Sequence, residues 1–495
     1  MKKTLNVLAV AALSMSLLAG CGNNNNADSS AGSSSSSSKS GKLETLNILY
    51  PGDASERMTE FLENEFAEKM AADLNLDVKL TYVPWSQYWE NKDIMLAASE
   101  PIDLYWDGIP YLSQIVNKKQ AQPLDDLLAE YGQNLLKVLP ESQFEGGKVD
   151  GQIYAIPSAY APSSAMFQMV TVRQDILEAV GMTEIKTTDD LYEFSKRAAQ
   201  QFPEMKGAAD PVIKPITRYF AEEQYNFIGP EELVVFGEES KKAYSYYETE
   251  AFQELIKFGN KMYAEKLYTE DLTIKYNERD TRMQTGLYLW VEGSIGKEME
   301  IYNTVKAAAP DAELKSYLLA DEKPRYITAT GGEIMVIPYT AKNPTGAMKF
   351  LNWLYESQEN YLFALYGVEG KDYEIVDGRI NKIAANDFFY EWMFRNQNYQ
   401  VFAPNVEQEA IDQYQNWDNN AIVSDSLGFA FNNENVKQIE TALIEVAGKE
   451  IAALRTGFLD FDKGYEAAIS ALKKAGIDEY VAEYQRQLDE FIANK

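Results

Sequence analysis

The sequence predicts an α/β fold, because patterns typical of strands alternate with patterns typical of helices from residue 46 onward. Residues 46–50 and 102–106 are largely apolar runs, and residues 78–83 alternate apolar with polar side chains. Between them, apolar residues recur at spacings of three and four over 58–70, and a second helical stretch covers 89–98. This β-α-β-α-β order predicts a largely parallel sheet with crossover helices.

The carboxyl ends of these three strands form a candidate site, since ligands of open α/β sheets bind beyond the carboxyl ends of the strands. Tyr50 ends the first strand, Trp85 follows the second, and Trp106 and Asp107 end the third. We therefore expect three aromatic side chains and one carboxylate at this edge of the sheet.

The strand and helix patterns restart after residue 157. Further strands are expected at 166–172, 287–292 and 331–338, and helices at 173–180, through most of 187–266, at 345–357 and from 436 to the C-terminus. In the last helical region Val481, Tyr484, Leu488 and Phe491 fall on one stripe. At about 100–200 residues per domain, the chain predicts two or three lobes with sizeable cores.

The composition excludes several classes of function. The 495 residues carry 76 acidic and 46 basic side chains, a net charge of −30, which argues against binding to nucleic acid or anionic lipid. Histidine is absent, so Ser-His-Asp triads, Cys-His dyads and histidine-ligated zinc are excluded. Asp460-x-Asp462-x-Gly464 has the spacing of a calcium loop, but its twelfth position is Ala471 rather than glutamate. We expect no metal and no cofactor.

The first 21 residues have the pattern of a secretory signal. Lys2-Lys3 precede an apolar run over 5–18, and Leu18-Ala19-Gly20 precede Cys21. The run is shorter than the ~20 residues of a membrane-spanning helix. The sequence around Cys21 resembles a bacterial lipobox, which implies cleavage before this cysteine and lipid attachment to its thiol. An ordinary signal peptide with an incidental cysteine is the alternative.

A tether is expected between Cys21 and the folded part of the chain. Residues 22–42 are rich in asparagine and then serine and contain no large apolar side chain. Such a segment cannot bury enough apolar surface to offset its ordering entropy, so we expect it to be disordered. Cys21 is the only cysteine, so no intramolecular disulfide competes for it.

Spaced motifs along the chain resemble those of extracellular solute-binding proteins that serve ABC sugar importers. The resemblance covers nearly the whole chain and is strongest for the large Gram-positive oligosaccharide branch of family 1. It rests on 150–157 (Asp-Gly-x-Ile-Tyr-x-x-Pro), on Arg173, Asp175, Leu177 and Gly181, on 342–353 (Lys-Asn-Pro, then a Phe-Leu-x-Trp stripe), on 366–373 and on the tail from Leu427.

This resemblance implies two α/β lobes, each with a mostly parallel sheet flanked by helices, joined by a multi-pass hinge. Crossings between the lobes are expected near 157–163, 328–332 and 372–377. The first lobe would combine 43–158 with about 330–374, and the second about 159–329 with 375–495. The implied protein is a lipid-anchored monomer on the outer face of the cytoplasmic membrane, with an oligosaccharide ligand and ABC permease subunits as partners.

A sugar-binding site needs aromatic plates for the C–H faces and fixed carboxylates or amides for the hydroxyl groups. Trp106 and Asp107 offer both, and matching residues of the family commonly touch sugar, although Trp106 could instead pack in the core. The further candidates are Trp85 at the rim, Tyr160 just beyond the hinge signal, Trp290 and Glu292 on one face of their strand, and Tyr50. Trp89 is expected to pack on the helix underneath it and Trp353 in the core, while Trp392 and Trp417 could each line the cleft or pack in the core, with the core favoured.

Two other classes of function fit the same composition. A secreted glycoside hydrolase would use two carboxylates, and 76 acidic residues make some suitable pair unavoidable. A surface sensor or adhesin could share the fold without a role in transport. Turnover of oligosaccharides would identify the first alternative, and loss of uptake in a deletion strain would exclude the second.

Overall fold

The computed structural model describes residues 42–139, 141–158, 163–269, 272, 278–328, 332–383 and 388–494. Residues 43–495 form one compact unit. The predicted signal peptide, Cys21 and all of the tether except Lys42 lie outside the described residues. Among the helices that the structure describes, none is both long and apolar enough to cross a membrane.

The first lobe is built on a five-stranded sheet with the strand order β2-β1-β3-β14-β6. Its strands are β1 (Glu44–Pro51), β2 (Leu76–Val83), β3 (Leu104–Gly108), β6 (Ala155–Pro157) and β14 (Glu333–Val336). β1 is parallel to β2 and β3, which confirms the parallel pairing predicted for this region. β14 is antiparallel to β3 and β6, so the sheet as a whole is mixed.

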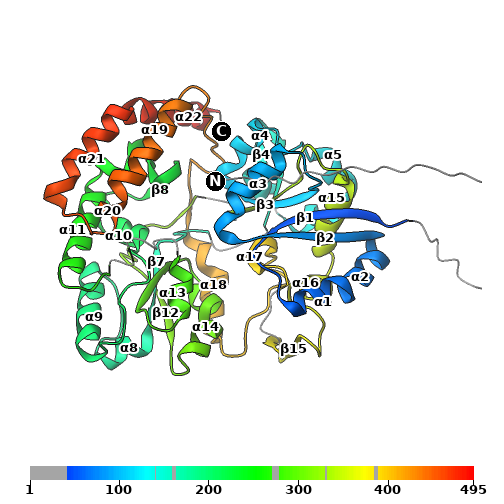
Figure 1. The fold of residues 1–495 in the computed structure, drawn as a ribbon, viewed down its shortest axis with the longest axis horizontal. Coiled ribbons are helices and arrows are strands. Elements are labelled where there is room, and N and C mark those ends of the chain that lie inside the picture. Colours follow the sequence, from blue (N-terminus) through cyan, green and yellow to red (C-terminus); the bar gives the residue numbers. More distant parts are fainter. Residues whose placement is uncertain are drawn as a thin grey trace, which may run out of the picture. The chain divides into compact units, whose positions relative to one another are not determined.

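Helices from both ends of this lobe's sequence pack on the sheet (Figure 1). They are α1 (Glu56–Glu63), α2 (Glu65–Leu74), α3 (Tyr88–Ala97), α4 (Leu112–Asn117), α5 (Asp125–Tyr131), α6 (Gln133–Val138), α7 (Glu141–Phe144), α15 (Pro344–Leu354), α16 (Gln358–Tyr366) and α17 (Glu391–Phe394). α1 begins where Ser55 accepts a hydrogen bond from the Met58 N–H. Phe61 and Met70, on the predicted apolar stripe, are buried against this core.

The second lobe contains two antiparallel three-stranded sheets rather than the mostly parallel sheet that we expected. The first has the order β11-β7-β12, from β7 (Met169–Arg173), β11 (Trp290–Gly293) and β12 (Leu314–Leu318); the second has the order β10-β9-β8, from β8 (Tyr225–Phe227), β9 (Val234–Gly237) and β10 (Lys242–Ser245). The stretch 187–266, which we expected to be mostly helical, therefore contains the three strands β8, β9 and β10 as well as the helices α9, α10 and α11. A short connection joins β9 to β10, and such connections produce antiparallel pairs.

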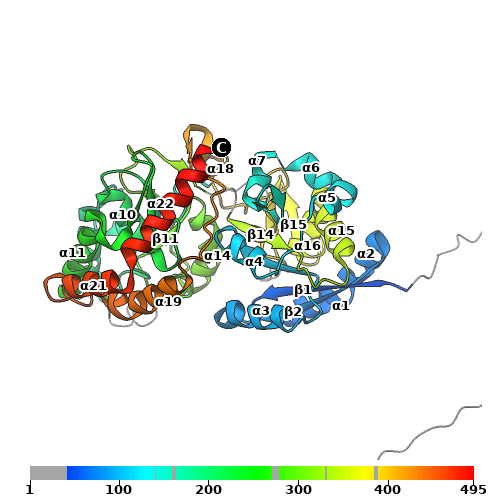
Figure 2. The ribbon, with the colours of Figure 1, turned by 90° about the horizontal axis from the view of Figure 1, so that it is seen from above.

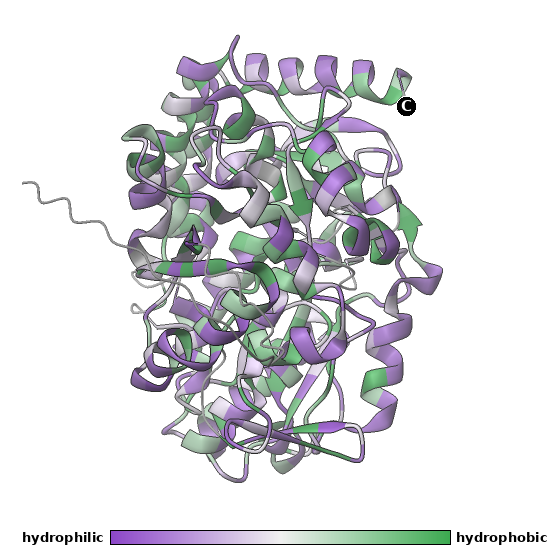
Figure 3. Ribbon diagram, turned by 90° about the vertical axis from the view of Figure 1, so that its right-hand side faces the viewer, coloured by the Kyte–Doolittle hydropathy of each residue, from purple (hydrophilic) through white to green (hydrophobic). Residues whose placement is uncertain are grey.

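Helices surround these sheets and reach to the end of the chain (Figure 2). They are α8 (Gln174–Ala179), α9 (Thr188–Gln201), α10 (Ile213–Phe220), α11 (Glu250–Ala264), α13 (Arg279–Gln284), α14 (Lys297–Ala308), α18 (Gln408–Asn416), α19 (Lys437–Val446), α20 (Ala452–Arg455), α21 (Phe461–Ala475) and α22 (Ile477–Ala493). α22 is amphipathic (Figure 3), and its buried stripe includes Tyr484 and Leu488 as predicted. Asp462 and Gly464 lie inside α21, so the segment with calcium-loop spacing is a helix.

Residues 373–383 and 388–401 remain with the first lobe, which corrects the expected crossing at 372–377. β15 (Tyr373–Val376) and β16 (Arg379–Lys382) form a hairpin. Phe388 and Phe389 are then fully buried in the first core. Phe402 packs instead against a small separate cluster that includes Met169 and Trp417, and its ring centroid lies 5.9 Å from that of Tyr414.

Three segments meet where the chain passes between the two cores. Asp418 accepts hydrogen bonds from the backbone N–H groups of Ser163 and Ser164 at 2.7 and 3.0 Å. The indole N–H of Trp417 donates to the Ser164 carbonyl at 2.9 Å. β13 (Tyr326–Ile327) pairs in parallel with β17 (Ile422–Val423), and Ser164 forms a bridge to Ile327. Trp417 is buried, as expected.

Candidate aromatic binding site

An aromatic surface lies at the carboxyl ends of β1, β2 and β3. Because these adjacent strands are parallel, their carboxyl ends meet at one edge of the sheet. We use the term aromatic surface for Trp85, Tyr88, Trp89, Trp106, Tyr111, Tyr390 and Trp392. The sequence placed Trp85 and Trp106 here, and the structure brings these two rings to 5.6 Å.

Trp106 is the centre of this surface. Its ring centroid lies 5.1 Å from Trp89 and 5.3 Å from Trp392. The interplanar angles at these contacts, 51° and 79°, are those of tilted and edge-to-face packing. The hydroxyl group of Tyr88 donates a hydrogen bond to the Trp106 carbonyl at 2.8 Å and so holds the end of β3 from beneath.

The outer rings of the surface are accessible to solvent. Trp85, Trp89 and Tyr111 are 43%, 42% and 44% exposed, and Tyr390 and Trp392 are half-buried. Large aromatic side chains usually lose most of their exposure in a folded core, so a group of exposed rings indicates a ligand surface. Trp89, at the start of α3 after the short 3-10 turn at Trp85–Gln87, contacts Tyr88 and Lys92 of its own helix and still remains exposed.

A carboxylate that the sequence analysis did not single out is fixed against this surface. Oε2 of Glu333, the first residue of β14, accepts a hydrogen bond from the Trp106 indole N–H at 2.5 Å. Burial raises the pKa of Glu333 to about 7, although this hydrogen bond and the charge of Arg395 oppose the shift. The sequence feature that could have identified Glu333 is the position of an acidic side chain at the start of an otherwise apolar strand.

Asp107 takes a structural position instead of facing the aromatic surface. Its side chain has no exposed surface, it forms a buried ion pair with Lys92, and it accepts a hydrogen bond from the Gly108 N–H at 2.8 Å. The ammonium group of Lys92 also lies 4.6 Å from the Trp89 ring centroid. Burial raises the pKa of Asp107, while Lys92 favours its charged form. Asp107 thus holds Lys92 under the aromatic surface.

Tyr50 is buried and supports a neighbouring segment. Its ring stacks on Tyr390 at 5.3 Å, and its hydroxyl oxygen accepts a hydrogen bond from the Tyr390 backbone N–H at 2.6 Å. Gly52 follows at φ +110°, where a Cβ atom would lie 2.6 Å from the Tyr390 hydroxyl oxygen. Glycine is therefore required for Tyr390 to approach this strand end.

The segment at 388–392 supplies two rings that the sequence analysis did not assign to the site. Tyr390 and Trp392 stack at 5.5 Å with an interplanar angle of 11°, and Trp392 also contacts Trp85. We expected Trp392 in the core. The segment lies nearly 300 residues beyond Trp106, so no local pattern could have placed it beside β3.

Trp290 and Glu292 belong to the interior of the second lobe. Trp290 has no exposed surface and packs on Phe194 at 6.2 Å. The Glu292 carboxylate accepts from the Lys214 backbone N–H at 3.0 Å and from Arg279 at 3.1 Å. Burial and the nearby Glu292 carboxylate raise the pKa of Asp210. β11 is buried on both faces, which explains why neither side chain reaches a surface.

Tyr160, the remaining candidate, lies outside the described residues.

The second lobe also presents aromatic and charged side chains near the crossings. Two cations lie near the Phe167 ring: the Lys214 ammonium group is 5.0 Å and the Arg279 guanidinium carbon 5.1 Å from its centroid. Burial raises the pKa of Tyr111 in the first lobe, and the charges of Asp107 and of Glu231 in the second lobe raise it further.

This chemistry suits binding better than hydrolysis. A glycoside hydrolase needs two carboxylates that both reach the scissile bond, but of the two carboxylates beside Trp106, Asp107 is sealed in an ion pair. Within the described ranges, no three acidic or cysteine side chains are grouped so as to hold a metal ion. Exposed rings with one fixed carboxylate match the needs of a ligand that has apolar faces and hydroxyl groups.

Comparison with known proteins agrees with this reading. A carbohydrate ABC transporter substrate-binding protein of Streptococcus pneumoniae serotype 4 is 26% identical over 98% of this chain and 97% of its own length. Lipoprotein LipO of Bacillus subtilis strain 168 is 21% identical over 78% of this chain and 76% of its own.

Solved structures share the fold. The N-glycan transport solute binding protein NgtS of Streptococcus pneumoniae superposes with a TM-score of 0.76 at 21% identity, covering 91% of this chain and 99% of that one. The Streptococcus pneumoniae substrate binding protein FusA, in complex with kestose, gives a TM-score of 0.62 at 16% identity over 91% of this chain and 100% of its own.

Family models cover most of the folded chain. Residues 425–493 match a domain of unknown function. Residues 55–361, more than half of the chain, match the bacterial extracellular solute-binding proteins, whose members bind solutes and do not transform them. The chain therefore belongs to the family of bacterial extracellular solute-binding proteins.

Proposed function

We propose that this protein captures an oligosaccharide on the aromatic surface, between its two lobes, and delivers it to an ABC importer. The observation that carries the proposal is the group of exposed rings around Trp106 with the Glu333 carboxylate fixed beside them. The names of the similar proteins support the ligand class, since they describe carbohydrate, N-glycan and kestose binding in those proteins.

In the proposed complex, Trp85, Trp89, Trp392 and Tyr111 stack on the apolar faces of sugar rings. One oxygen of Glu333 is engaged by Trp106, and the other accepts a sugar hydroxyl group. Side chains of the second lobe near Phe167 contact the opposite side of the ligand. Contacts from both lobes favour a closed arrangement, because a ligand shifts the equilibrium toward the state that it binds more tightly.

The extent of the aromatic surface supports a ligand of several sugar units. Successive centroid distances along Tyr390, Trp85, Trp106, Trp89 and Tyr111 are 5.8, 5.6, 5.1 and 5.3 Å. Trp106 is only 7% exposed, so the accessible rings lie around it, and a pyranose ring, roughly the size of one aromatic ring, would cover only a part of them. We expect affinity to rise with chain length from one sugar to three or more.

We also propose that the protein acts as a monomer anchored by a lipid on Cys21 outside the cytoplasmic membrane. The pattern at 18–21 supports the anchor, and the Bacillus subtilis relative is named a lipoprotein. The Asn- and Ser-rich segment would then serve as the tether. Replacement of Cys21 by serine should release the protein into the medium and abolish incorporation of a labelled fatty acid.

Thermal unfolding of residues 43–495, one compact unit, tests the ligand class. A panel of glycans, including the Man5GlcNAc found in an NgtS complex and the kestose found in a FusA complex, is titrated against the protein. A ligand that binds only the folded state raises the melting temperature by mass action. Trp85→Ala and Trp392→Ala should each weaken binding about tenfold or more, as expected of aromatic residues that dominate an interface.

Phe458→Ala is the matched control, because Phe458 is 49% exposed but contacts Tyr263 in the second lobe. Its variant should bind like the wild type. A flat response to every glycan would contradict an oligosaccharide ligand, and the release of new reducing ends would contradict a purely binding function.

A further inference from the structure

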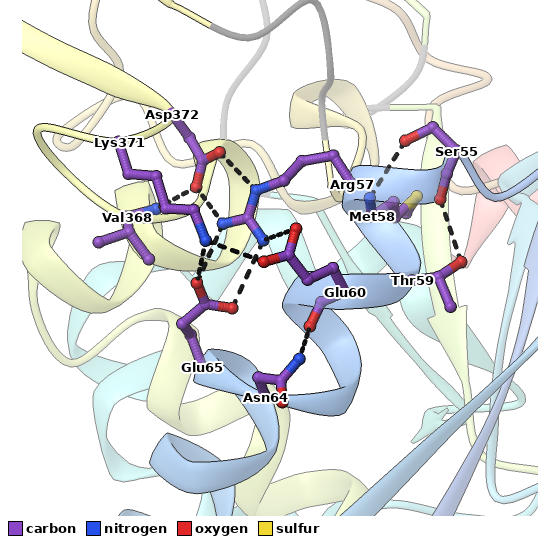
Figure 4. Close-up of polar contacts among 10 residues, drawn as sticks. All are labelled: Ser55, Arg57, Met58, Thr59, Glu60, Asn64, Glu65, Val368, Lys371 and Asp372. Atoms are coloured by element: carbon purple, nitrogen blue, oxygen red, sulfur yellow. Dashed lines mark hydrogen bonds and ion pairs between the residues drawn. The ribbon is translucent and has the colours of Figure 1, made fainter.

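An ionic network joins the start of α1 to the loop before β15 (Figure 4). Arg57 donates from Nε to Asp372 Oδ1 at 2.8 Å and from a terminal nitrogen to Oδ2 at 2.7 Å. The side chains are only 15% and 2% exposed. A two-point pair with this much shielding is unlike the flexible ion pairs common on protein surfaces.

Three further charges enclose this pair. Glu65 accepts from Arg57 at 3.2 Å and from Lys371 at 2.8 Å, and Glu60 accepts from Lys371 at 3.2 Å. Burial opposes ionisation of Asp372, but the hydrogen bonds from Arg57 and from the backbone hold its pKa below the usual value. The network therefore stays charged at neutral pH.

The loop that the network holds is fixed in its conformation by close contacts. Asp372 Oδ2 also accepts from the Val368 backbone N–H at 2.9 Å. Gly367 precedes it at φ +91°, where a Cβ atom would lie 2.5 Å from Asp372 Oδ2 and 2.3 Å from the Phe388 ring. Loop, carboxylate and Phe388 are thus packed directly on one another.

Arg57 and its helix also hold Phe388 itself. The guanidinium carbon lies 5.6 Å from the Phe388 ring centroid, and Phe61 of α1 lies 4.2 Å from it. Phe388 is fully buried. It stands two residues before Tyr390 and four before Trp392, the two rings of the aromatic surface that come from this segment.

We propose that the Arg57–Asp372 pair is a positioning device that sets where Tyr390 and Trp392 stand on the aromatic surface. This inference rests on the proposed function, in which those rings contact the ligand. Tyr50 anchors the segment at Tyr390, and Arg57 with Phe61 anchors its start at Phe388. Anchors at Phe388 and Tyr390 fix the position of this segment and the direction in which it continues to Trp392. A buried two-point ion pair suits this task, because its geometry allows only one arrangement of the loop.

The first test needs no sugar. Amide hydrogen exchange is measured on residues 43–495 for Arg57→Met, Arg57→Lys, Asp372→Asn and a control, Arg486→Met, which removes a guanidinium group from surface pairs with Glu483 and Glu490. We expect exchange in 388–394 to accelerate about tenfold or more in Arg57→Met and less in Arg57→Lys, with α9 unchanged. Unchanged exchange in 388–394 would overturn the inference, as would a uniform rise across both lobes. If Arg57→Met does not fold, exchange in 388–394 is compared between the wild type and the variants Arg57→Lys and Asp372→Asn, with the same outcomes.

The second test uses the glycan that raises the melting temperature most, with Man5GlcNAc as the first probe. Arg57→Met should weaken its binding about fivefold or more in the wild-type background and clearly less in a Trp392→Ala background, where only Tyr390 is left to be displaced. Equal losses in the two backgrounds would overturn the inference. If no glycan binds the wild type, the proposed function fails, whereas local acceleration of exchange in 388–394 would still establish that Arg57 positions these rings.

Discussion

Trp106 is held in place by a carboxylate as well as by neighbouring rings. The hydrogen bond from its indole N–H to Glu333 fixes the rotation of the ring about its side-chain bonds. Burial of the carboxylate makes its charge costly, and this cost appears as the raised pKa. A residue whose pKa lies near 7 beside a ligand surface couples protonation to binding.

The first prediction concerns Glu333→Gln and pH. Because burial raises the folded-state pKa of Glu333 to about 7, the folded state binds this proton more tightly than the unfolded state does. The corresponding stability is present in acid and is lost as pH rises from about 4.5 to about 7. The free energy of unfolding of the wild type should therefore fall over this range by up to about 3 kcal/mol relative to that of Glu333→Gln, measured by urea denaturation.

Affinity should follow the opposite trend. The charged carboxylate is the better acceptor for a sugar hydroxyl, so wild-type affinity should weaken below about pH 7, while the affinity of Glu333→Gln stays constant. Glu238→Gln is the control, since burial also raises the pKa of Glu238 to about 7 but this residue binds Ser424 in the second lobe. A pH-independent wild-type affinity would contradict this role of Glu333.

At the scale of elements, the C-terminal helices are part of the second lobe's core. Tyr484 of α22 stacks on Phe431 at 3.5 Å and donates a hydrogen bond to the Ile228 carbonyl at 3.0 Å. Gly259 of α11 approaches Gly457 so closely that a Cβ atom on Gly259 would lie 2.9 Å from the Gly457 Cα. The segment at 425–493, matched by a domain of unknown function, is therefore needed to complete this lobe.

The second prediction is that Tyr484→Ala destabilises the protein by about 3 kcal/mol or more, because Tyr484 is 2% exposed and truncation of a buried aromatic ring leaves a cavity. Guanidinium denaturation followed by circular dichroism measures the change. Glu479→Ala, an exposed substitution on the same helix, should change stability by less than about 0.5 kcal/mol. Equal stability of the two variants would mean that α22 is peripheral to the fold.

At the scale of the whole molecule, Trp417 and Asp418 join the segments that cross between the cores. The Asp418 carboxylate binds two successive backbone N–H groups, and the Trp417 carbonyl accepts from Arg325 at 2.9 Å. The Arg325 guanidinium carbon also lies 4.1 Å from the Trp417 ring centroid. One short stretch thus ties the segment after residue 162 to the strand β13.

The third prediction is that Asp418→Asn loosens this junction. An amide has one oxygen where the carboxylate has two, so at least one charge-assisted hydrogen bond to Ser163 or Ser164 is lost, worth about 1.5–3 kcal/mol. We expect a broader distribution of distances between spin labels on the two lobes, and sugar affinity reduced several-fold because the binding-competent arrangement is less populated. Asp412→Asn, on the exposed face of α18, is the control. An unchanged distance distribution would show that Asp418 does not restrain the lobes.

The sequence by itself determined the local features of this protein. Periodicity was sufficient for the parallel strands β1, β2 and β3 and for the amphipathic helices, because side chains three, four or two residues apart share a face by covalent geometry alone. The motifs identified the family, and the ends of the strands led to Trp85 and Trp106.

Only the tertiary structure decided which side chains form the site. Asp107 and Trp106 are adjacent in sequence and both are buried, yet Asp107 pairs with Lys92 whereas the Trp106 ring packs under the exposed rings of the aromatic surface. Glu333, Tyr390 and Trp392 come from residues far along the chain, and their position depends on β14 pairing with β3 and on Phe388 packing against α1. Long-range contacts of this kind leave no periodic trace in the sequence, since any buried apolar segment satisfies the local pattern.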